Sequence, residues 1–182
     1  AIAEFAARHP DVRIEIESML SADLRVALAN DRIDISVAVV PEGDVPYLVE
    51  TTTVEPLWAV AEDAKIDFNA PIPIVRHPDP CEYASRMRNA LRTAGRSWRT
   101  QLVSRDVEGL QSAVLAGLGA TALTPATLKE GMRVTREDER FPKLGPLKIG
   151  LFYKHAVLHD AGQAMAQHLL DQIQKKDQAQ ST

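Results

Sequence analysis

The chain has 182 residues, 45% of them hydrophobic and 25% charged, which suits one globular domain or a domain split into two small lobes. No apolar run approaches the roughly 18 residues of a membrane-spanning helix, and Glu4, Arg8 and His9 interrupt any signal-peptide core. The single cysteine excludes an internal disulfide framework and fits a reducing compartment. A net charge of -4 gives the chain as a whole no attraction to DNA or anionic membranes.

The first forty residues alternate between helical and strand patterns. Residues 1–8 have helical spacing without a preceding turn or methionine, so we expect them to lie inside a longer protein. Valine and isoleucine alternate with charged residues over 12–17, which predicts a half-buried strand. Ser21 is predicted to cap a helix that runs to about residue 30. The β-branched run at 33–40 predicts a strand covered on both faces, and this order of elements indicates a parallel sheet with crossover helices.

The remaining elements are short and are separated by proline and glycine. We expect strands at 57–61, 74–75, 102–103, 120–123 and 147–153. We expect helices at 80–94, at 106–116, from Thr124-Pro125 to Gly131, and from Asp160 onward, where Asp160 and Gln163 resemble a capping pair. The fold class is therefore α/β, with two βα-rich halves joined by extended segments, an organisation that implies a cleft and hinge bending.

Three blocks of the sequence resemble the effector-binding domain of LysR-type transcriptional regulators. They are FAARHPDVRIEIE (5–17), LRVALANDRIDISVAV (24–39), in which Asp31 replaces the usual glycine, and DVEGLQSAVLAGLGATALTPATL (106–128). Residues 81–99 resemble one subgroup of that family, from which Glu82 and Ala84 depart. The blocks occur in the family's order and spacing, so the resemblance covers about 5–170.

The resemblance implies the fold of type 2 periplasmic binding proteins, with an effector bound between two lobes joined by two crossovers. Lobe I is then expected at 1–55 plus 157–176, lobe II at 56–156, and a disordered tail at 177–182. The resemblance also implies that the family's N-terminal winged helix-turn-helix, and the first strand of lobe I with its effector-contacting loop, are expected outside this chain.

Candidate effector-binding residues follow the predicted strands, where helix starts face the ligand cleft of an open α/β sheet. Free backbone N–H groups and the positive end of the helix dipole there favour an anionic group. These candidates are Ser21, Ser104, Arg105 and Thr124 at helix starts, and His77, Pro78 and Cys81 after the strand at 74–75. The alternatives are plain caps, a surface histidine and a cysteine that fills apolar space.

Further patterns in the sequence each have a functional or a simpler structural interpretation. Cys81 lies near a predicted helix start, where the dipole lowers a thiol pKa, so one interpretation of Cys81 is a redox sensor. Arginines 88, 92, 96 and 99 have helical spacing within a run that has no acid between Ser85 and Arg105, so they form either a nucleic-acid face or a solvated or intersubunit face. The acidic pair Asp138-Glu139 is predicted to be solvated, and AGLGA (116–120) to end a helix and enter a strand.

No residue pattern predicts an enzyme, a cofactor or a metal site. His155 and His159 are separated by a strand end and a loop, and no nucleophile motif occurs. We therefore expect a small-molecule-sensing domain of a cytoplasmic LysR-type regulator, which binds an anionic effector and acts through a homodimer or tetramer. DNA would be bound only through the N-terminal domain outside this chain, and no membrane is involved. The alternative is a periplasmic-type solute-binding protein of a transport system.

Overall fold

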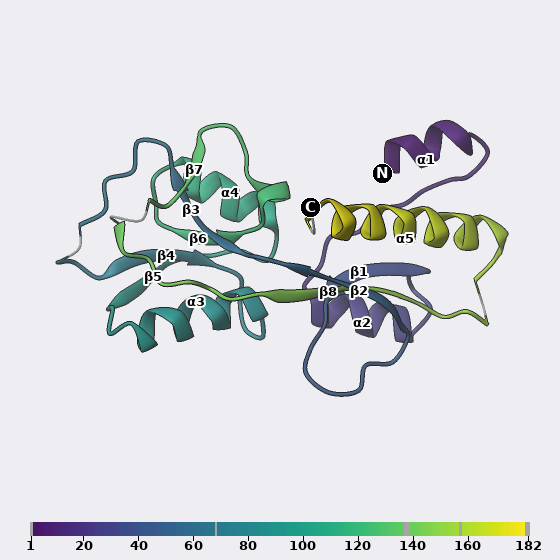
Figure 1. Cartoon of the computed structure of the whole chain (residues 1–182), viewed down its shortest axis with the longest axis horizontal. Helices are drawn as coiled ribbons and strands as arrows, with labels where there is room; N and C mark the ends of the chain where they lie inside the picture. The colour runs from purple at the N-terminus through teal and green to yellow at the C-terminus, as the bar shows by residue number, and fades with distance from the viewer. Residues whose placement is uncertain (1, 68, 137–138, 157, 181–182) are drawn as a thin grey trace. The chain divides into compact units, whose positions relative to one another are not determined.

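The computed structural model describes residues 2–67, 69–136, 139–156 and 158–180, with side chains through residue 172. The chain forms two compact units, unit 1 (Ala1–Thr53 with Leu147–Thr182) and unit 2 (Val54–Pro146). In chain order (Figure 1), the elements are α1 (Ile2–Arg8), α2 (Ser21–Ala29), β1 (Ile35–Val39), β2 (Leu48–Val54), β3 (Leu57–Ala61), β4 (Ile72–Arg76), α3 (Glu82–Thr93), β5 (Trp98–Val103), α4 (Val107–Leu115), β6 (Thr121–Leu123), the 3-10 helix η1 (Pro125–Thr127), β7 (Met132–Val134), β8 (Leu147–Tyr153) and α5 (Asp160–Gln180).

Unit 1 is a three-stranded sheet, ordered β1-β8-β2, with a helix packed on each face. Neighbouring residues of β8 point to opposite faces, as the pleat of a strand requires. Phe152 packs with Leu28 of α2, whereas Leu151 packs with Ala166 of α5. The short helix α1 is held on α5 by the buried Phe5, whose ring lies 5.8 Å from that of His168.

Unit 2 contains a mixed sheet in which three strands run parallel. Strands β4 and β5 pair in parallel, and a parallel bridge from Ile74 to Ala120 aligns β6 with them. Strand β3 then pairs antiparallel with both β6 and β7. The carboxyl ends of β4, β5 and β6 consequently lie at the same edge of this sheet, which is where α/β proteins bind ligands.

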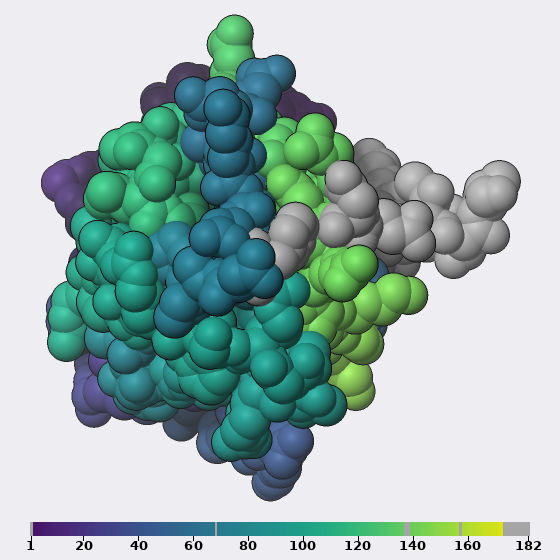
Figure 2. Space-filling view, turned by 90° about the vertical axis from the view of Figure 1, so that its left-hand side faces the viewer, coloured from purple at the N-terminus to yellow at the C-terminus, as the bar shows by residue number. Residues whose placement is uncertain are grey.

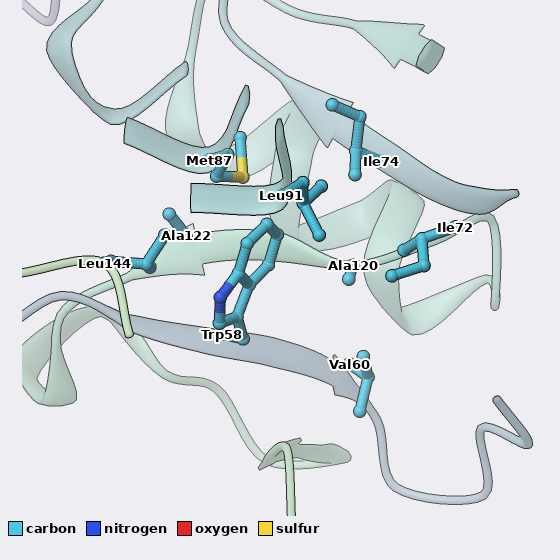
Figure 3. Packing of buried hydrophobic residues seen from close by; sticks show 9 residues of the cluster. All are labelled: Trp58, Val60, Ile72, Ile74, Met87, Leu91, Ala120, Ala122 and Leu144. Carbon is cyan, nitrogen blue, oxygen red and sulfur yellow. The ribbon is translucent and has the colours of Figure 1, made fainter. Parts of the chain in front are cut away.

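Alternating residues of β4 direct α3 and α4 to opposite faces of the unit 2 sheet. Ile74 packs with Leu91 of α3, whereas Val75 packs with Leu110 of α4. Figure 3 shows the cluster on the α3 side, which consists of Trp58, Val60, Ile72, Ile74, Met87, Leu91, Ala120, Ala122 and Leu144. The Trp58 indole donates a hydrogen bond to the Pro142 carbonyl at 2.8 Å, so the one polar atom of this large side chain is satisfied.

Unit 1 differs from the sequence-based expectation at its strands. Residues 12–17 form no strand, because a strand needs a hydrogen-bonded neighbour and no described strand pairs with them. The predicted parallel sheet is also wrong for this unit, since β1 pairs antiparallel with β8. Val37 is 48% exposed, so β1 is not covered on both faces. The alternation in 12–17 indicates an extended segment but cannot specify its partner.

The second boundary between the units also differs from the prediction. Residues 147–156 were assigned to lobe II, but β8 pairs with β1 and therefore belongs to unit 1. The sequence does not predict β2 or β7, because LVETTTV has no sustained apolar alternation and MRV is too short to show one. Helix α5 continues to Gln180, so the backbone of 177–180 is helical where a disordered tail was expected, and residues 181–182 lie outside the described part.

Helix α5 begins at the predicted cap residue itself, one residue earlier than expected. Asp160 is the first helical residue rather than the N-cap. The backbone N–H of Gly162 instead donates to Nδ1 of His159 at 3.1 Å, so an imidazole satisfies the helix start. The predicted partner Gln163 donates from its amide to the Leu158 carbonyl at 2.9 Å.

Candidate ligand-binding site

The residue after each parallel strand of unit 2 is one of the candidates from the sequence. His77 follows β4, Ser104 follows β5 and Thr124 follows β6. Nδ1 of His77 lies 2.8 Å from the Ser104 carbonyl oxygen, and the Ser104 N–H donates to the Arg76 carbonyl at 3.0 Å. The structure thus brings His77 and Ser104 into direct contact and places Thr124 at the same sheet edge, as the parallel topology requires.

The turn at Ser104 is organised by the cap of α4. Asp106 is the N-cap residue, and its carboxylate accepts a hydrogen bond from the Gly109 N–H. This bond, more than any other contact, lowers the pKa of Asp106, so the group is ionised at neutral pH. The Ser104 hydroxyl donates to Asp106 at 3.2 Å, and Arg105 lies exposed between them. The Ser104 hydroxyl therefore has a role in the turn whether or not a ligand binds.

Thr124 caps η1 as predicted, with Pro125 at the first helical position. The Thr124 N–H donates to the Thr127 hydroxyl at 3.0 Å, and the two threonine hydroxyls lie 3.2 Å apart. The amide of Gln111 on α4 donates to the Thr127 carbonyl at 2.8 Å, which ties this turn to the helix. The expected short helix, however, ends at Thr127 rather than continuing to Gly131.

The loop from His77 to Cys81 carries a charged cluster that the sequence pattern does not predict. Asp79 accepts from Arg88 at 2.7 Å and from Arg76 at 3.3 Å. Its pKa is lowered, first by the hydrogen bond from Arg88. The signal available in the sequence was the polar stretch directly after a buried strand, where Arg76 and Asp79 flank the candidates His77 and Pro78.

Cys81 is the N-cap residue of α3, but its thiol does not have the lowered pKa that a redox sensor needs. Burial raises the pKa of Cys81 and outweighs the opposing hydrogen bonds from the backbone N–H groups of Ala84 and Tyr83. Burial also raises the pKa of Tyr83 to about 12. The protonated thiol is thus the favoured form, and the cysteine behaves as a half-buried small side chain.

Ser21 lies in unit 1 and is the first residue of α2 rather than its cap. The N-cap position belongs to Leu20, whose side chain makes no capping bond. The Ser21 hydroxyl instead accepts a hydrogen bond from the Val39 N–H at 3.1 Å, and Arg25 donates to the Val39 carbonyl at 3.1 Å. Ser21 is therefore positioned at the carboxyl end of β1.

The arginine run does not form one helical face. Helix α3 ends at Thr93, so Arg96 lies beyond it and Arg99 is part of β5. The other arginines have partners in the described structure: Arg86 pairs with Glu82 at 3.2 Å, and Arg92 donates to Asn89 at 3.0 Å. These contacts oppose a nucleic-acid face and agree with a solvated helix surface.

A further pocket of unit 2 lies beside helix α3. An open pocket of about 500 Å³ separates the outer face of α3 from residues 142–144. Figure 2 shows the teal surface of α3 beside the yellow-green surface of that segment. No cluster of three metal-ligating side chains occurs among the residues that the structure describes. Within the same residues, no helix combines the length and the apolarity that a membrane span requires.

The chain matches a known protein family. Residues 1–174 match the model of the LysR substrate binding domain. The chain is 25% identical over 135 residues to the HTH-type transcriptional regulator PecT of Dickeya dadantii (strain 3937), covering 74% of this chain and 42% of PecT. The chain thus spans less than half the length of that relative.

Solved structures share the fold at low sequence identity. The regulatory domain of HypT from Salmonella typhimurium in its apo-form has a TM-score of 0.68 and 14% identity, covering 86% of this chain and 80% of that one. The CcmR regulatory domain of Synechocystis PCC6803 in complex with 2-PG has a TM-score of 0.66 and 15% identity, covering 94% and 88%. This chain belongs to the LysR substrate-binding domain family, and its fold is of the type 2 periplasmic-binding-protein class.

Proposed function

We propose that this domain senses a small anionic effector, which binds at the carboxyl ends of the parallel strands of unit 2. The observation that carries the proposal is the convergence of His77, Ser104 and Thr124 at the carboxyl ends of three parallel strands. Backbone N–H groups at such strand ends favour anions. The proposed site also contains Pro78, Cys81 and Arg105 from unit 2, and Ser21 of unit 1 stays a prediction from the sequence.

The charges at this edge of unit 2 support an anionic ligand. Arg76, Arg88 and Arg105 lie on the segments that end or follow β4 and β5, and the carboxylates of Asp79 and Asp106 are already engaged in hydrogen bonds. The CcmR domain, which shares this fold, was solved with 2-PG, and the HypT domain was also solved with bromide ion bound. These neighbours favour ligand binding by the fold.

We propose further that effector binding biases the relative arrangement of the units, which requires a ligand that interacts more favourably with one arrangement than with the other. In the full-length protein, a segment outside this chain would bind DNA. The protein would act in the cytoplasm as a homodimer or tetramer, since palindromic operators mirror two-fold symmetry. Sequencing the coding DNA upstream of Ala1 tests this part directly, because it should encode a helix-turn-helix.

The effector site itself is tested by a thermal-shift screen of small carboxylates and phosphates, followed by calorimetry on hydroxyl-deletion variants. We expect Thr124→Ala and Ser104→Ala to weaken binding of the best compound about tenfold or more. The exposed Ser112 on α4 offers a matched control, so Ser112→Ala should bind normally. Unchanged affinity in the first two variants, together with a lowered melting temperature, would show that these residues are only caps.

A further inference from the structure

One carboxylate in unit 2 is shared by two guanidinium groups. Asp79 Oδ1 accepts from Arg88 at 2.7 Å, and Asp79 Oδ2 accepts from Arg76 at 3.3 Å. The pairing leaves the cluster with one positive charge in excess, and the nearby carboxylate of Glu82 is already bound to Arg86. Coulombic attraction therefore favours a second anion at this position.

Arg76 has anchors besides the carboxylate, and both guanidinium side chains are less exposed than that of Asp79. Arg76 is also anchored by bonds to the Thr100 hydroxyl at 3.3 Å and to the His77 carbonyl at 2.9 Å. The side chains of Arg76 and Arg88 are 17% and 28% exposed, whereas that of Asp79 is 55% exposed. Exposed ion pairs contribute little stability, so the Asp79 carboxylate can be displaced at small cost.

One donor in the cluster has no acceptor. Nη1 of Arg88 is shielded from solvent and makes no hydrogen bond to any described residue. Buried donors in folded proteins are nearly always satisfied, so an unsatisfied one calls for a bound water, ion or ligand. Arg88 donates to Asp79 through Nη2 alone, so its Nη1 group is available. A carboxylate could then accept two parallel hydrogen bonds from Arg88, which is the bidentate geometry that carboxylates prefer.

We propose that the carboxylate of a small organic acid binds between Arg88 and Arg76, where it takes the place of the Asp79 carboxylate. The ligand carboxylate accepts from both nitrogens of the Arg88 fork, which satisfies the buried donor. Asp79 lies in the same loop as His77 and Cys81, so its release alters the loop that carries these site residues. The inference rests on the proposed function for its effector class and adds to it a specific anchoring pair.

Acetate titration followed by NMR of the arginine Nε–H groups tests the exchange in the 182-residue chain. Acetate replaces chloride at constant ionic strength, and Arg88→Lys and Arg76→Lys assign the signals. We expect saturable shifts at Arg88 and Arg76. Asp79→Asn removes the internal competitor and should increase acetate affinity about tenfold. Arg92 on the same helix is the matched control, since it contacts Asn89 and should not shift.

The outcomes separate this inference from the proposed function. Arg88 shifts that remain linear in acetate and equal those of Arg92, in both the wild-type chain and Asp79→Asn, would overturn the exchange site. If the Arg88 shifts saturate with acetate but Ser104→Ala and Thr124→Ala leave the effector affinity unchanged, the inference is supported and the proposed effector site is contradicted. If the Arg88 shifts do not saturate but Ser104→Ala and Thr124→Ala weaken effector binding, the effector site is supported and the arginine anchor is contradicted.

Discussion

Asp31 occupies a backbone conformation that glycine adopts more easily. It follows the last turn of α2 with φ of 54°, in the left-handed region. The backbone N–H of Asp31 donates to Leu28 at 3.2 Å and that of Arg32 to Ala27 at 2.9 Å, the bond pattern of a Schellman helix end. Lys154 compensates in part, because its ammonium binds Asp31 at 2.7 Å and the Ala29 carbonyl at 2.8 Å.

The backbone cost at this position is measured by comparing Asp31→Gly with Asp31→Ala. Both changes remove the exposed ion pair to Lys154, but only glycine suits the left-handed conformation. We expect the glycine variant to be more stable than the alanine variant by about 1 kcal/mol in urea unfolding. Equal stabilities would mean that the chain relaxes out of this conformation.

Glu139 was expected to be solvated as part of a polar loop, but it is only 3% exposed. Arg133 binds both of its carboxylate oxygens, at 2.7 and 2.9 Å, and the Arg136 N–H donates to it at 2.6 Å. Asp138, the other member of the acidic pair, lies outside the described residues. The hydrogen bond from Arg133 is the first cause of a lowered Glu139 pKa.

Glu139→Gln is therefore expected to destabilise the chain by about 3 kcal/mol at pH 7, because it leaves the Arg133 charge without its partner. A carboxyl whose folded-state pKa is lowered contributes stability above its ordinary value of 4.5 and loses it as the pH falls through the folded-state value. The gap between wild type and variant should thus stay constant from neutral pH to about 5 and shrink below that. Urea unfolding at several pH values checks both points, and a gap that widens on acidification would contradict them.

At the scale of elements, two glycines set how α4 is followed by β6. Gly117, with φ of 73°, ends α4 through bonds from its N–H to Val114 and from Leu118 to Ala113. This confirms the interpretation of AGLGA as a helix end that enters a strand. Gly119 has a different role, because a Cβ there would overlap the carbonyl oxygen of Pro73 in β4.

These roles predict unequal costs for the same substitution. Gly117→Ala meets no atom within 4 Å and should cost about 1 kcal/mol for its conformation alone. Gly119→Ala must push β6 away from β4 and should cost about 3 kcal/mol. Thermal unfolding of the pair measures the difference. Similar costs would indicate that the β4–β6 contact can open freely.

Strong local patterns explain which elements could be predicted from the sequence. Gly95, with positive φ, lies just beyond the end of α3, and β8 alternates apolar residues, so both elements can be predicted from their own residues. Pairing depends on distant residues instead. The alternation at 12–17 cannot supply a neighbouring strand, and nothing in 147–153 itself indicates its antiparallel pairing with β1. Tertiary pairing, rather than propensity, decided these cases.

In the candidate site, too, some features could be predicted from the sequence and others depend on tertiary structure. The sequence placed His77, Ser104 and Thr124 after strands, and the parallel topology brings those strand ends to one edge. It did not indicate that Arg88, eleven positions beyond His77, reaches back to Asp79 across the start of α3. Sequence spacing predicts contacts within a helix or along a strand, whereas this contact depends on the path of the loop between them.

At the scale of the whole molecule, the described residues form separate hydrophobic clusters, and each cluster lies within one unit. Leu91 in unit 2 and Leu151 in unit 1 are matched probes, since both are 0% exposed. Leucine-to-alanine substitution at either should cost about 3 kcal/mol through lost transfer energy and a residual cavity.

Hydrogen exchange can then show whether the units respond independently. If each unit opens from its own core, Leu91→Ala accelerates exchange in β3, β4 and α3 more than in β1 and β8, and Leu151→Ala does the reverse. Such a result would mean that an effector can reposition the units without disrupting either core, as a binding-coupled rearrangement requires. Equal acceleration in both units by both variants would instead show that the chain opens as one cooperative body, in which case effector binding would have to act on the stability of the whole.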